Sequence, residues 1–486
     1  RNKSFDQAQQ HLEQAVDLAP RNLFRQQKLQ QLSRLNHDYE RQYKSARDLL
    51  KFARHSMYEQ PDLYLNLARA CIDYAVSMDE DGETNKLSKQ ATEALNQLRN
   101  AFPQSDTHEQ QTVLQARLHY LRAQKDKALK ILETMDEVPL QITALGGSPG
   151  GTVEAEVVRF ADLAALQAAP EGSLKGKIAF VDYQMLPFRD GRDYGRGGAI
   201  RSKGPSEAIR KGAVGFLMRS AGTDNHRVAH TGITRFDEGL TPVPSASLTI
   251  PDADQLARLL QRGPVRVSLA LDCGWDGEYT SHNVIGEITG RSLPKEVVVI
   301  GGHLDSWDLG TGAIDDGAGI AITMAAGHLI GQLKQAPKRT IRVIAFANEE
   351  QGLHGGKAYA EKHVGDITRH QIAAESDFGA GRIYAFNTGS PNPQGSRDAT
   401  RQIAEVLKPL GIEYAADKGG PGPDVGPLAA KGGAWAWLAQ DGSDYFHLHH
   451  TADDTLDKID PAALAQNVAA YTVFAYLAAE ADGSFG

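Results

Sequence analysis

The stretch GGHLDSWDLGTGAIDDGAG, residues 301–319, gathers polar side chains between two apolar segments. It holds one His, four Asp and six Gly. The apolar run EVVVI precedes it, and the small-residue helical pattern IAITMAAGHLI follows it. A buried strand, a Gly- and Asp-rich loop and a helix in this order predict an α/β fold. The loop itself is either a solvated turn or a place where side chains hold metal.

The same arrangement recurs through residues 276–486. Further apolar runs are HNVIGEITG, TIRVIAFAN (340–348), IAAESDFG (372–379) and AWAWLAQ (434–440). Helical patterns lie between them and end with PAALAQNVAAYTVFAYLAAE. Polar groups gather just past the carboxyl ends of the apolar runs, at the edge where open α/β sheets bind ligands. We therefore expect a mixed sheet flanked by helices, with a site at that edge.

Five residues at these positions have the chemistry of metal ligands: His303, Asp315, Glu350, Asp377 and His450. Two imidazoles and three carboxylates suit Zn²⁺, which takes N and O ligands at ~2.0–2.2 Å. Five ligands exceed the need of one catalytic zinc, but they suit two ions ~3.5–4 Å apart that share a carboxylate. Each residue alone has an ordinary interpretation, such as a surface His or a helix cap, and only their order along the chain favours metal.

Glu349 precedes one of these residues directly, and in an extended segment its side chain points the other way. A carboxylate there can take a proton from a water that bridges two ions and give it to a leaving amine. The pair Glu349-Glu350 also fits a solvated helix start, and His450 competes with His447 and His449 for the ligand position.

Four segments together resemble the two-zinc exopeptidase family of bacterial leucyl aminopeptidases, glutamate carboxypeptidases and plasma glutamate carboxypeptidase-like dipeptidases. GGHLDSWDLGTGAIDDGAG is similar to the family's first metal segment, and FANEEQGLHGG to its Glu-Glu segment. ESDFG is similar to its Asp segment, and HHTADDT to its last His segment. HLDSWDLGTGAIDDGAG and HHT agree best with the dipeptidase branch. With the region before them, the resemblance covers roughly residues 140–480.

The resemblance implies a role for each candidate residue. His303 and Asp377 would hold one zinc, Glu350 and His450 the other, and Asp315 would bridge the two. Glu349 would be the general acid and base. HTADDT matches the family's His-Thr-x-x-Asp-Thr form, which favours His450 over its neighbour as the ligand.

Other residues of these segments receive supporting roles by the same resemblance. Asp305 would accept a hydrogen bond from His303 and fix its tautomer. Asp316 would shape the turn, whereas Asp308 has no role beyond a solvated loop. His449 and Tyr445 are candidates for contacts with the oxyanion or with the substrate terminus.

Residues 138–275 predict a small α/β domain. GKIAFVDY (176–183) is a strand, SEAIRKGAVGFLMRS (206–220) a helix and a strand, and VPSASLTI a strand before the capped helix PDADQLARLLQRG. These segments resemble a protease-associated domain, which implies a lid or substrate-restricting role without chemistry of its own. His226 and His230 are expected to be surface or hydrogen-bonding residues rather than metal ligands.

Residues 1–137 predict an all-α region, because only Gly82 of the 48 glycines falls before position 146. FDQAQQHLEQAVDLAPRN and ARLHYLRAQKDKALKIL resemble tetratricopeptide helices. Such repeats imply a partner-binding surface; a spacer or a generic helical bundle is the alternative. The two-zinc family usually places part of its catalytic unit before the protease-associated domain, so the junction at DEVPLQITALGG departs from its pattern.

Composition limits the other functions. The chain has 486 residues and a net charge of −9, so no broad basic field attracts nucleic acid or anionic lipid. Its apolar runs are shorter than the ~20 residues of a membrane helix. The two cysteines, Cys71 and Cys273, give no disulfide framework. The chain starts RNKSFD without Met, and the family resemblance implies a secreted or periplasmic protein.

The leading hypothesis is a two-zinc exopeptidase that hydrolyses dipeptides or removes N-terminal residues. One alternative is a non-catalytic receptor or scaffold on a peptidase fold, with the helices as its working part. Another is glutaminyl cyclisation, whose enzymes typically bind one zinc. The sequence does not separate an aminopeptidase from a dipeptidase or a carboxypeptidase, and it leaves homodimer formation open.

Overall fold

A computed structural model describes the chain except for residues 1–2, 79–80, 106, 133–137, 417 and 486. The chain divides into two compact units, Arg1–Pro139 and Leu140–Gly486, which are described separately. Of the predicted junction DEVPLQITALGG (136–147), residues 136 and 137 lie outside the described set.

The first unit is helical, as the sequence predicts. Its helices are α1 (Lys3–Leu18), α2 (Leu23–Leu35), α3 (Tyr39–Ala53), α4 (Pro61–Val76), α5 (Asp81–Ala101), α6 (His108–Leu121) and α7 (Lys125–Leu132). Helices adjacent in the chain pack on one another, and Tyr64, Ile72, Leu95 and Leu98 are fully buried between them. The likeness to tetratricopeptide repeats stays a prediction.

The second unit contains two sheets. The first has the order β1-β5-β4-β3-β2-β6. Its strands are β1 (Ile142–Ala144), β2 (Gly151–Phe160), β3 (Ile178–Val181), β4 (Gly215–Arg219), β5 (Ser245–Leu248) and β6 (Arg266–Leu271). The four central strands are parallel, and both edge strands are antiparallel to their neighbours. The helices of this region are α8 (Leu163–Gln167), α9 (Tyr194–Arg210) and α10 (Ile250–Leu260).

The second sheet is mixed, with the order β12-β11-β13-β10-β8-β9-β7. Its strands are β7 (Val284–Ile288), β8 (Leu293–His303), β9 (Arg339–Phe346), β10 (His370–Glu375), β11 (Ile383–Gly389), β12 (Glu413–Tyr414) and β13 (Trp435–Gln440). The central strands β13, β10, β8 and β9 are parallel to one another. The helices are α11 (Ala318–Gly331), α12 (His354–Lys362), α13 (Pro393–Leu407), α14 (Gly426–Ala430), α15 (Tyr445–Leu448) and α16 (Pro461–Glu480).

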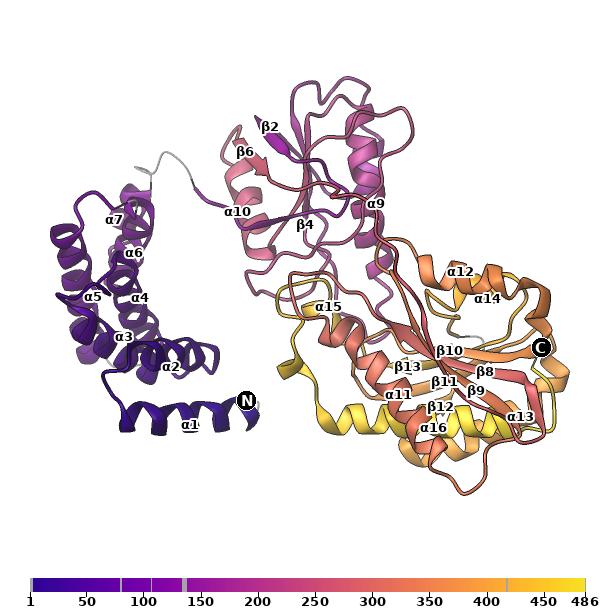
Figure 1. The fold of residues 1–486 in the computed structure, drawn as a ribbon. Helices are drawn as coiled ribbons and strands as arrows, with labels where there is room; N and C mark the ends of the chain where they lie inside the picture. Colours follow the sequence, from indigo (N-terminus) through magenta and orange to yellow (C-terminus); the bar gives the residue numbers. More distant parts are fainter. Residues whose placement is uncertain (1–2, 79–80, 106, 133–137, 417, 486) are drawn as a thin grey trace. The chain divides into compact units, whose positions relative to one another are not determined.

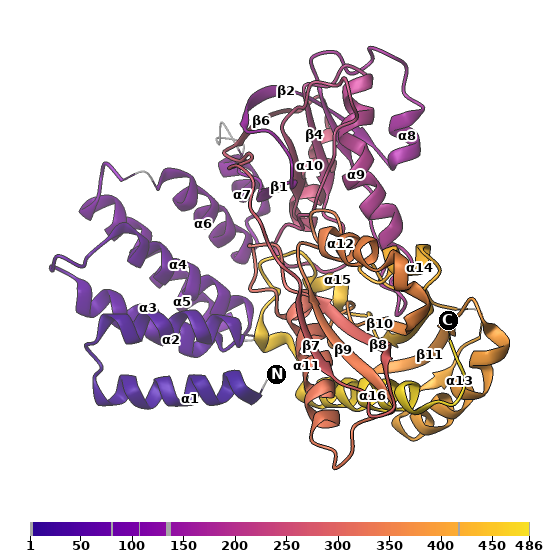
Figure 2. The same cartoon turned by 45° about the vertical axis from the view of Figure 1, so that its right-hand side comes forward.

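Helices cover both faces of this sheet, which explains the unbroken apolar run of β8. Val298 and Ile300 pack in one core with residues of α11, α13 and α16. Val297 and Val299 pack in another core with residues of α12 and α14. Figures 1 and 2 show α11 and α16 on one side of the sheet and α12 and α14 on the other. The prediction of a mixed α/β sheet flanked by helices is confirmed.

Two features differ from the sequence expectations. The antiparallel pair β2 and β6 was not predicted, because its strands are largely exposed and carry charged residues. Helix α16 is long and apolar enough, by length and composition, to cross a membrane, whereas the sequence analysis expected every apolar run to be shorter than a membrane helix. Half of its apolar stretch is buried, and Tyr471 and Phe474 pack in the core beside the second sheet.

Candidate metal centre

The predicted ligands follow neighbouring parallel strands. His303 is the last residue of β8, Glu349 and Glu350 follow β9, and Asp377 follows β10. His450 comes after β13 and the short helix α15. Since these four strands are parallel neighbours, their carboxyl ends meet at one edge of the sheet and bring these side chains together.

Asp315 stands at the centre of the cluster. Its Oδ1 lies 3.1 Å from Nε2 of His303, and its Oδ2 lies 3.1 Å from Nε2 of His450. The same His303 atom is 3.6 Å from Oδ1 of Asp377, and the same His450 atom is 2.9 Å from Oε2 of Glu350. One chain of contacts therefore joins all five predicted ligands, and they are buried or nearly so.

The tautomers of the two histidines suit a metal ion. Nδ1 of His303 lies 2.8 Å from the backbone oxygen of Asp305, and Nδ1 of His450 lies 3.1 Å from that of Thr231. A carbonyl oxygen only accepts, so each Nδ1 carries a hydrogen and each Nε2 faces the carboxylate oxygens. A proton on Nε2 or a metal ion can lie between these groups, and an imidazole held through its other nitrogen in this way is oriented to bind a metal ion.

The electrostatics of the cluster lead to the same conclusion. Burial lowers the pKa of His450, but the negative charge of Glu350 outweighs it and holds this pKa well above its ordinary value. Burial raises the pKa of Asp315, but hydrogen bonds with His303 and His450 hold it well below its ordinary value. Oε1 of Glu350 is buried and has no hydrogen-bond partner among the described residues. The donor set thus fits a divalent cation that accepts N and O ligands.

The structure changes the role expected for Asp305. Its carboxylate does not accept the hydrogen bond of His303; the backbone oxygen does, over 2.8 Å, while Oδ1 lies 3.8 Å away. The carboxylate instead accepts the backbone N–H groups of Glu349, over 2.9 Å, and of Glu350, over 3.1 Å. Those two donors attract the carboxylate more strongly than a ring already satisfied by a carbonyl. Asp305 therefore supports both the histidine and the Glu-Glu segment.

Asp316 and Asp454 fix the loop that carries Asp315. Asp316 accepts the backbone N–H of His303 over 2.9 Å and that of Gly319 over 3.1 Å. Asp454 accepts the N–H groups of Ile314, over 2.6 Å, and of Asp315, over 3.2 Å. The peptide bond between Asp315 and Asp316 is cis. The turn-shaping role expected for Asp316 agrees with these bonds.

Glu349 lies beside the ligands, with an oxygen of its carboxylate within 4.8 Å of ligand atoms of His303 and Glu350. It lines a cavity of about 460 Å³ together with Asp315, Asp377 and His450. Burial, followed by the charge of Asp377, raises the pKa of Glu349 to about 9. A carboxyl group with a raised pKa beside an open cavity suits proton transfer.

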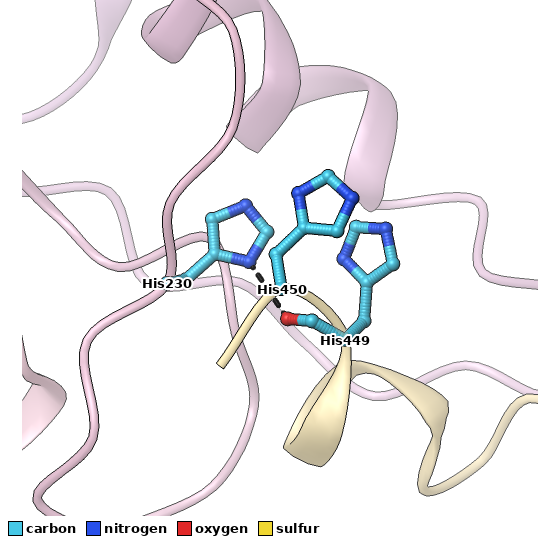
Figure 3. A group of neighbouring side chains, drawn as sticks. All are labelled: His230, His449 and His450. Carbon is cyan, nitrogen blue, oxygen red and sulfur yellow. Dashed lines mark hydrogen bonds between the residues drawn. The ribbon is translucent and has the colours of Figure 1, made fainter. Parts of the chain in front are cut away.

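The imidazole of His450 stacks on those of His230 and His449 (Figure 3). Nδ1 of His230 donates to the backbone oxygen of His449 over 3.0 Å, the dashed line in Figure 3. Nε2 of His230 accepts from Arg201 over 2.8 Å. Both nitrogens of His230 are therefore used, and the guanidinium of Arg201 adjoins the group, so we do not assign these three rings to a further metal site. His230 is a buried hydrogen-bonding residue, whereas His226 is exposed and contacts Asp453.

The remaining predicted residues occupy distinct positions. His449 is buried, with Nε2 at 3.3 Å from Oδ2 of Asp315 and Nδ1 without a partner among the described residues. Tyr445 packs its ring 4.9 Å from that of His449 and lines the same cavity. Asp308 is exposed.

Sequence reasoning missed three residues that support the centre. Trp307 donates from Nε1 to Oε2 of Glu350 over 2.8 Å, and Asp454 holds the loop of Asp315. Both stand inside the quoted motifs, which was the available signal. Arg201 comes from the region of the first sheet, and no local pattern marked it. His230, from the same region, was expected to form hydrogen bonds, but its contact with the centre was not predicted.

Comparisons with known proteins identify relatives of this chain. Residues 283–475 match peptidase family M28. Carboxypeptidase Q of Xenopus laevis is 34% identical, over 71% of this chain and 72% of its own length. Carboxypeptidase Q of Mus musculus is 32% identical, over 69% and 70% respectively. The crystal structure of a peptidase M28 precursor from Shewanella amazonensis is 40% identical, covers 88% of this chain and 99% of its own, and has a TM-score of 0.70.

Proposed function

This chain belongs to peptidase family M28 and is a metal-dependent exopeptidase, and from that premise we propose that two zinc ions and Glu349 hydrolyse the terminal peptide bond of short peptides. One observation carries the proposal. Nε2 of His303 and Nε2 of His450 face opposite oxygens of the single carboxylate of Asp315, each over 3.1 Å. A carboxylate flanked by two ligand groups in this way is arranged to bridge two ions.

The five residues divide between the two ions by their contacts. His303 contacts both Oδ1 of Asp315 and Asp377, and these three residues would hold one zinc. His450 contacts both Oδ2 of Asp315 and Glu350, and these three residues would hold the second. Mixed imidazole and carboxylate ligation is typical of zinc. Bound here, zinc would lower the pKa of water to about 7 and polarise the scissile carbonyl as a Lewis acid.

Glu349 moves the proton in this proposal. Its carboxylate accepts a proton from the attacking water and then donates it to the nitrogen of the leaving amine, as the peptide C–N bond breaks. Burial raises the pKa of Glu349 to about 9, and nearby positive charge lowers a carboxyl pKa. The two effects together place this group in the range that proton transfer near neutral pH requires.

His449 is the better of the two candidates for a contact with the carbonyl oxygen. Its Nδ1 is buried without a partner among the described residues, and its ring lies in the cavity wall. Tyr445 packs against the ring of His449 and orients it. An imidazole held in this way can donate a hydrogen bond to the oxygen that gains negative charge.

The substrates we propose are unblocked dipeptides and short peptides. The two similar curated proteins carry the name carboxypeptidase Q, which supports cleavage at a chain end. The solved relative is described as a precursor, which supports a location outside the cytoplasm.

The test measures metal content and activity on the same preparation. The full chain is stripped with a chelator, reloaded with zinc, and assayed on a dipeptide, its amino-blocked form and its carboxyl-blocked form. We expect two zinc ions per chain and hydrolysis of the unblocked dipeptide that returns with zinc. A single ion would contradict the bridging role of Asp315, and zinc-loaded protein without hydrolysis of any peptide would contradict the function.

A further inference from the structure

A second cavity, here called the side cavity, opens beside the metal centre. It measures about 240 Å³ and shares Asp377 and Phe378 with the cavity above the ligands. Its position lets it receive a substrate side chain next to the scissile bond. We propose that the side cavity selects substrates with a basic side chain, Lys or Arg, on the residue that supplies the scissile carbonyl; this inference rests on the exopeptidase function proposed above.

Glu375 is the residue that carries the inference. It ends β10 and lines the side cavity, although only 9% of it is exposed. Its Oε2 accepts the backbone N–H groups of Asp424, over 2.8 Å, and of Val425, over 3.1 Å. Its Oε1 is buried and has no hydrogen-bond partner among the described residues. A carboxylate oxygen left unpaired in a buried place is unfavourable, and a cationic donor from a ligand would satisfy it.

The charge of the side cavity favours a cation. Its described lining contains no Lys, Arg or His and includes three acidic residues. Asp377 is a proposed zinc ligand and Asp190 pairs with Arg192 over 3.0 Å, so Glu375 is the acidic group of this lining that remains for a ligand cation. Asp424, whose backbone binds Glu375, adds a buried carboxylate with an unpartnered Oδ2 among the described atoms. Arg189 lies 3.7 Å above the ring of Tyr384 but pairs with Asp441 and is not part of this lining.

The walls of the side cavity suit a long basic side chain. Phe378, Tyr384 and Trp437 line it together with the small residues of the loop 420–423. Aromatic faces pack against the methylenes of lysine or arginine and attract their charged ends. An apolar side chain would gain the same packing but would leave Oε1 of Glu375 unpaired.

Distance decides whether the substrate's side chain or its α-ammonium reaches Glu375 in the side cavity. Glu375 and Asp377 are two residues apart at the end of a strand, which places them roughly 6.6 Å apart along the chain. An α-ammonium stays about 2.5 Å from the scissile carbonyl carbon, whereas an extended lysine side chain reaches roughly 6 Å from its Cα. On this spacing, a lysine side chain has the length to reach Glu375 from a bond placed beside Asp377, and an α-ammonium does not.

The test compares two dipeptides that differ in charge and little in shape. Lys-Ala and norleucine-Ala are assayed with the zinc-loaded full chain and with its Glu375→Gln variant. The Gln amide oxygen can still accept from Asp424 and Val425, so the loop keeps its hydrogen bonds. We expect the unmodified chain to prefer Lys-Ala by at least about tenfold in kcat/KM. In Glu375→Gln, this preference is expected to fall to about twofold or less, with norleucine-Ala turnover changed less than about threefold.

Other outcomes overturn the inference. Equal or faster turnover of norleucine-Ala by the unmodified chain would show that the side cavity does not select positive charge. A Glu375→Gln variant with an unchanged preference would remove Glu375 from the explanation. If neither dipeptide nor any other peptide is hydrolysed, the proposed function fails and this inference fails with it, whereas turnover without a lysine preference overturns this inference alone.

Discussion

The carboxylate of Asp305 accepts the backbone N–H of Glu349 over 2.9 Å. The same carboxylate accepts the next N–H, and the backbone oxygen of Asp305 fixes the ring of His303. Asp305, which is not a proposed ligand, thus fixes the positions of the proposed ligand His303 and the proposed base Glu349 relative to each other. Supports of this kind typically affect metal affinity or activity by 10- to 100-fold.

Asp305→Asn tests the positioning role of Asp305 directly. The amide keeps one oxygen acceptor but presents an NH₂ group to one of the two N–H donors, so the segment of Glu349 and Glu350 should shift. We expect kcat/KM to fall roughly 10- to 100-fold. Asp308→Asn is the matched control, since Asp308 is exposed three residues further along the same loop. Steady-state kinetics of both variants decide the point, and equal activities would contradict the role of Asp305.

Trp307→Phe should weaken the metal position built from Glu350. The indole Nε1 donates to Oε2 of Glu350 over 2.8 Å, and phenylalanine removes that donor while keeping an aromatic ring. We expect the affinity of one of the two ions to fall roughly tenfold, measured by competition with a chromogenic chelator. Trp275→Phe, at a residue that is 70% exposed, serves as the control. Unchanged affinity for both ions would rule out this support.

His230→Ala should lower activity without removing metal. Nδ1 of His230 holds the backbone oxygen of His449, and the next residue, His450, has a left-handed φ of 59° that needs support. We expect a fall in kcat of about tenfold or more, with the metal content retained. His226→Ala, at an exposed side chain, should leave kcat unchanged. Loss of both ions from the variant would contradict this prediction and show that His230 is needed for metal binding.

Much of the fold and of the centre could be predicted because the information is local. The run VVVI (297–300) is apolar and buried at every position, and the polar residues follow such strands or end them. The glycines of the opening stretch are needed for close approach: a Cβ on Gly319 would lie 1.8 Å from the backbone oxygen of Ser376. Motif order therefore placed His303 and Asp315 correctly beside each other.

What could not be predicted depends on contacts between distant segments. The direction of the Asp305 carboxylate is set by its hydrogen bonds with Glu349 and Glu350, which lie 44 and 45 positions further along the chain. The bond from His230 to His449 spans 219 positions and joins the region of the first sheet to the centre. Glu375 looked like part of an apolar strand, and its orphan oxygen becomes visible only when the loop at Asp424 is in place.

The stability of the second unit should depend on pH through His370. This residue is 2% exposed, and Nε2 lies 2.8 Å from the hydroxyl of Tyr359. Burial lowers the pKa of His370 from 6.5 to about 4. Because the unfolded chain binds the proton more tightly, the stabilisation is present above pH 6.5 and is lost as the pH falls toward 4. The full loss is on the order of 3 kcal/mol.

Urea unfolding at pH 7.5 and pH 5 checks this dependence. The wild-type unfolding midpoint should fall at the lower pH by more than that of His370→Gln, which cannot take up a proton. The difference between the two proteins isolates His370 from the other titrating groups. An identical pH dependence in both would contradict the prediction.

The most direct measurement of the proposed chemistry is the activity of Glu349→Gln together with its metal content. Gln has nearly the same shape but cannot accept and return a proton at neutral pH. The proposed role of Glu349 predicts two bound ions and a kcat lowered roughly 10²- to 10⁴-fold. A fully loaded variant with near wild-type kcat would contradict that role.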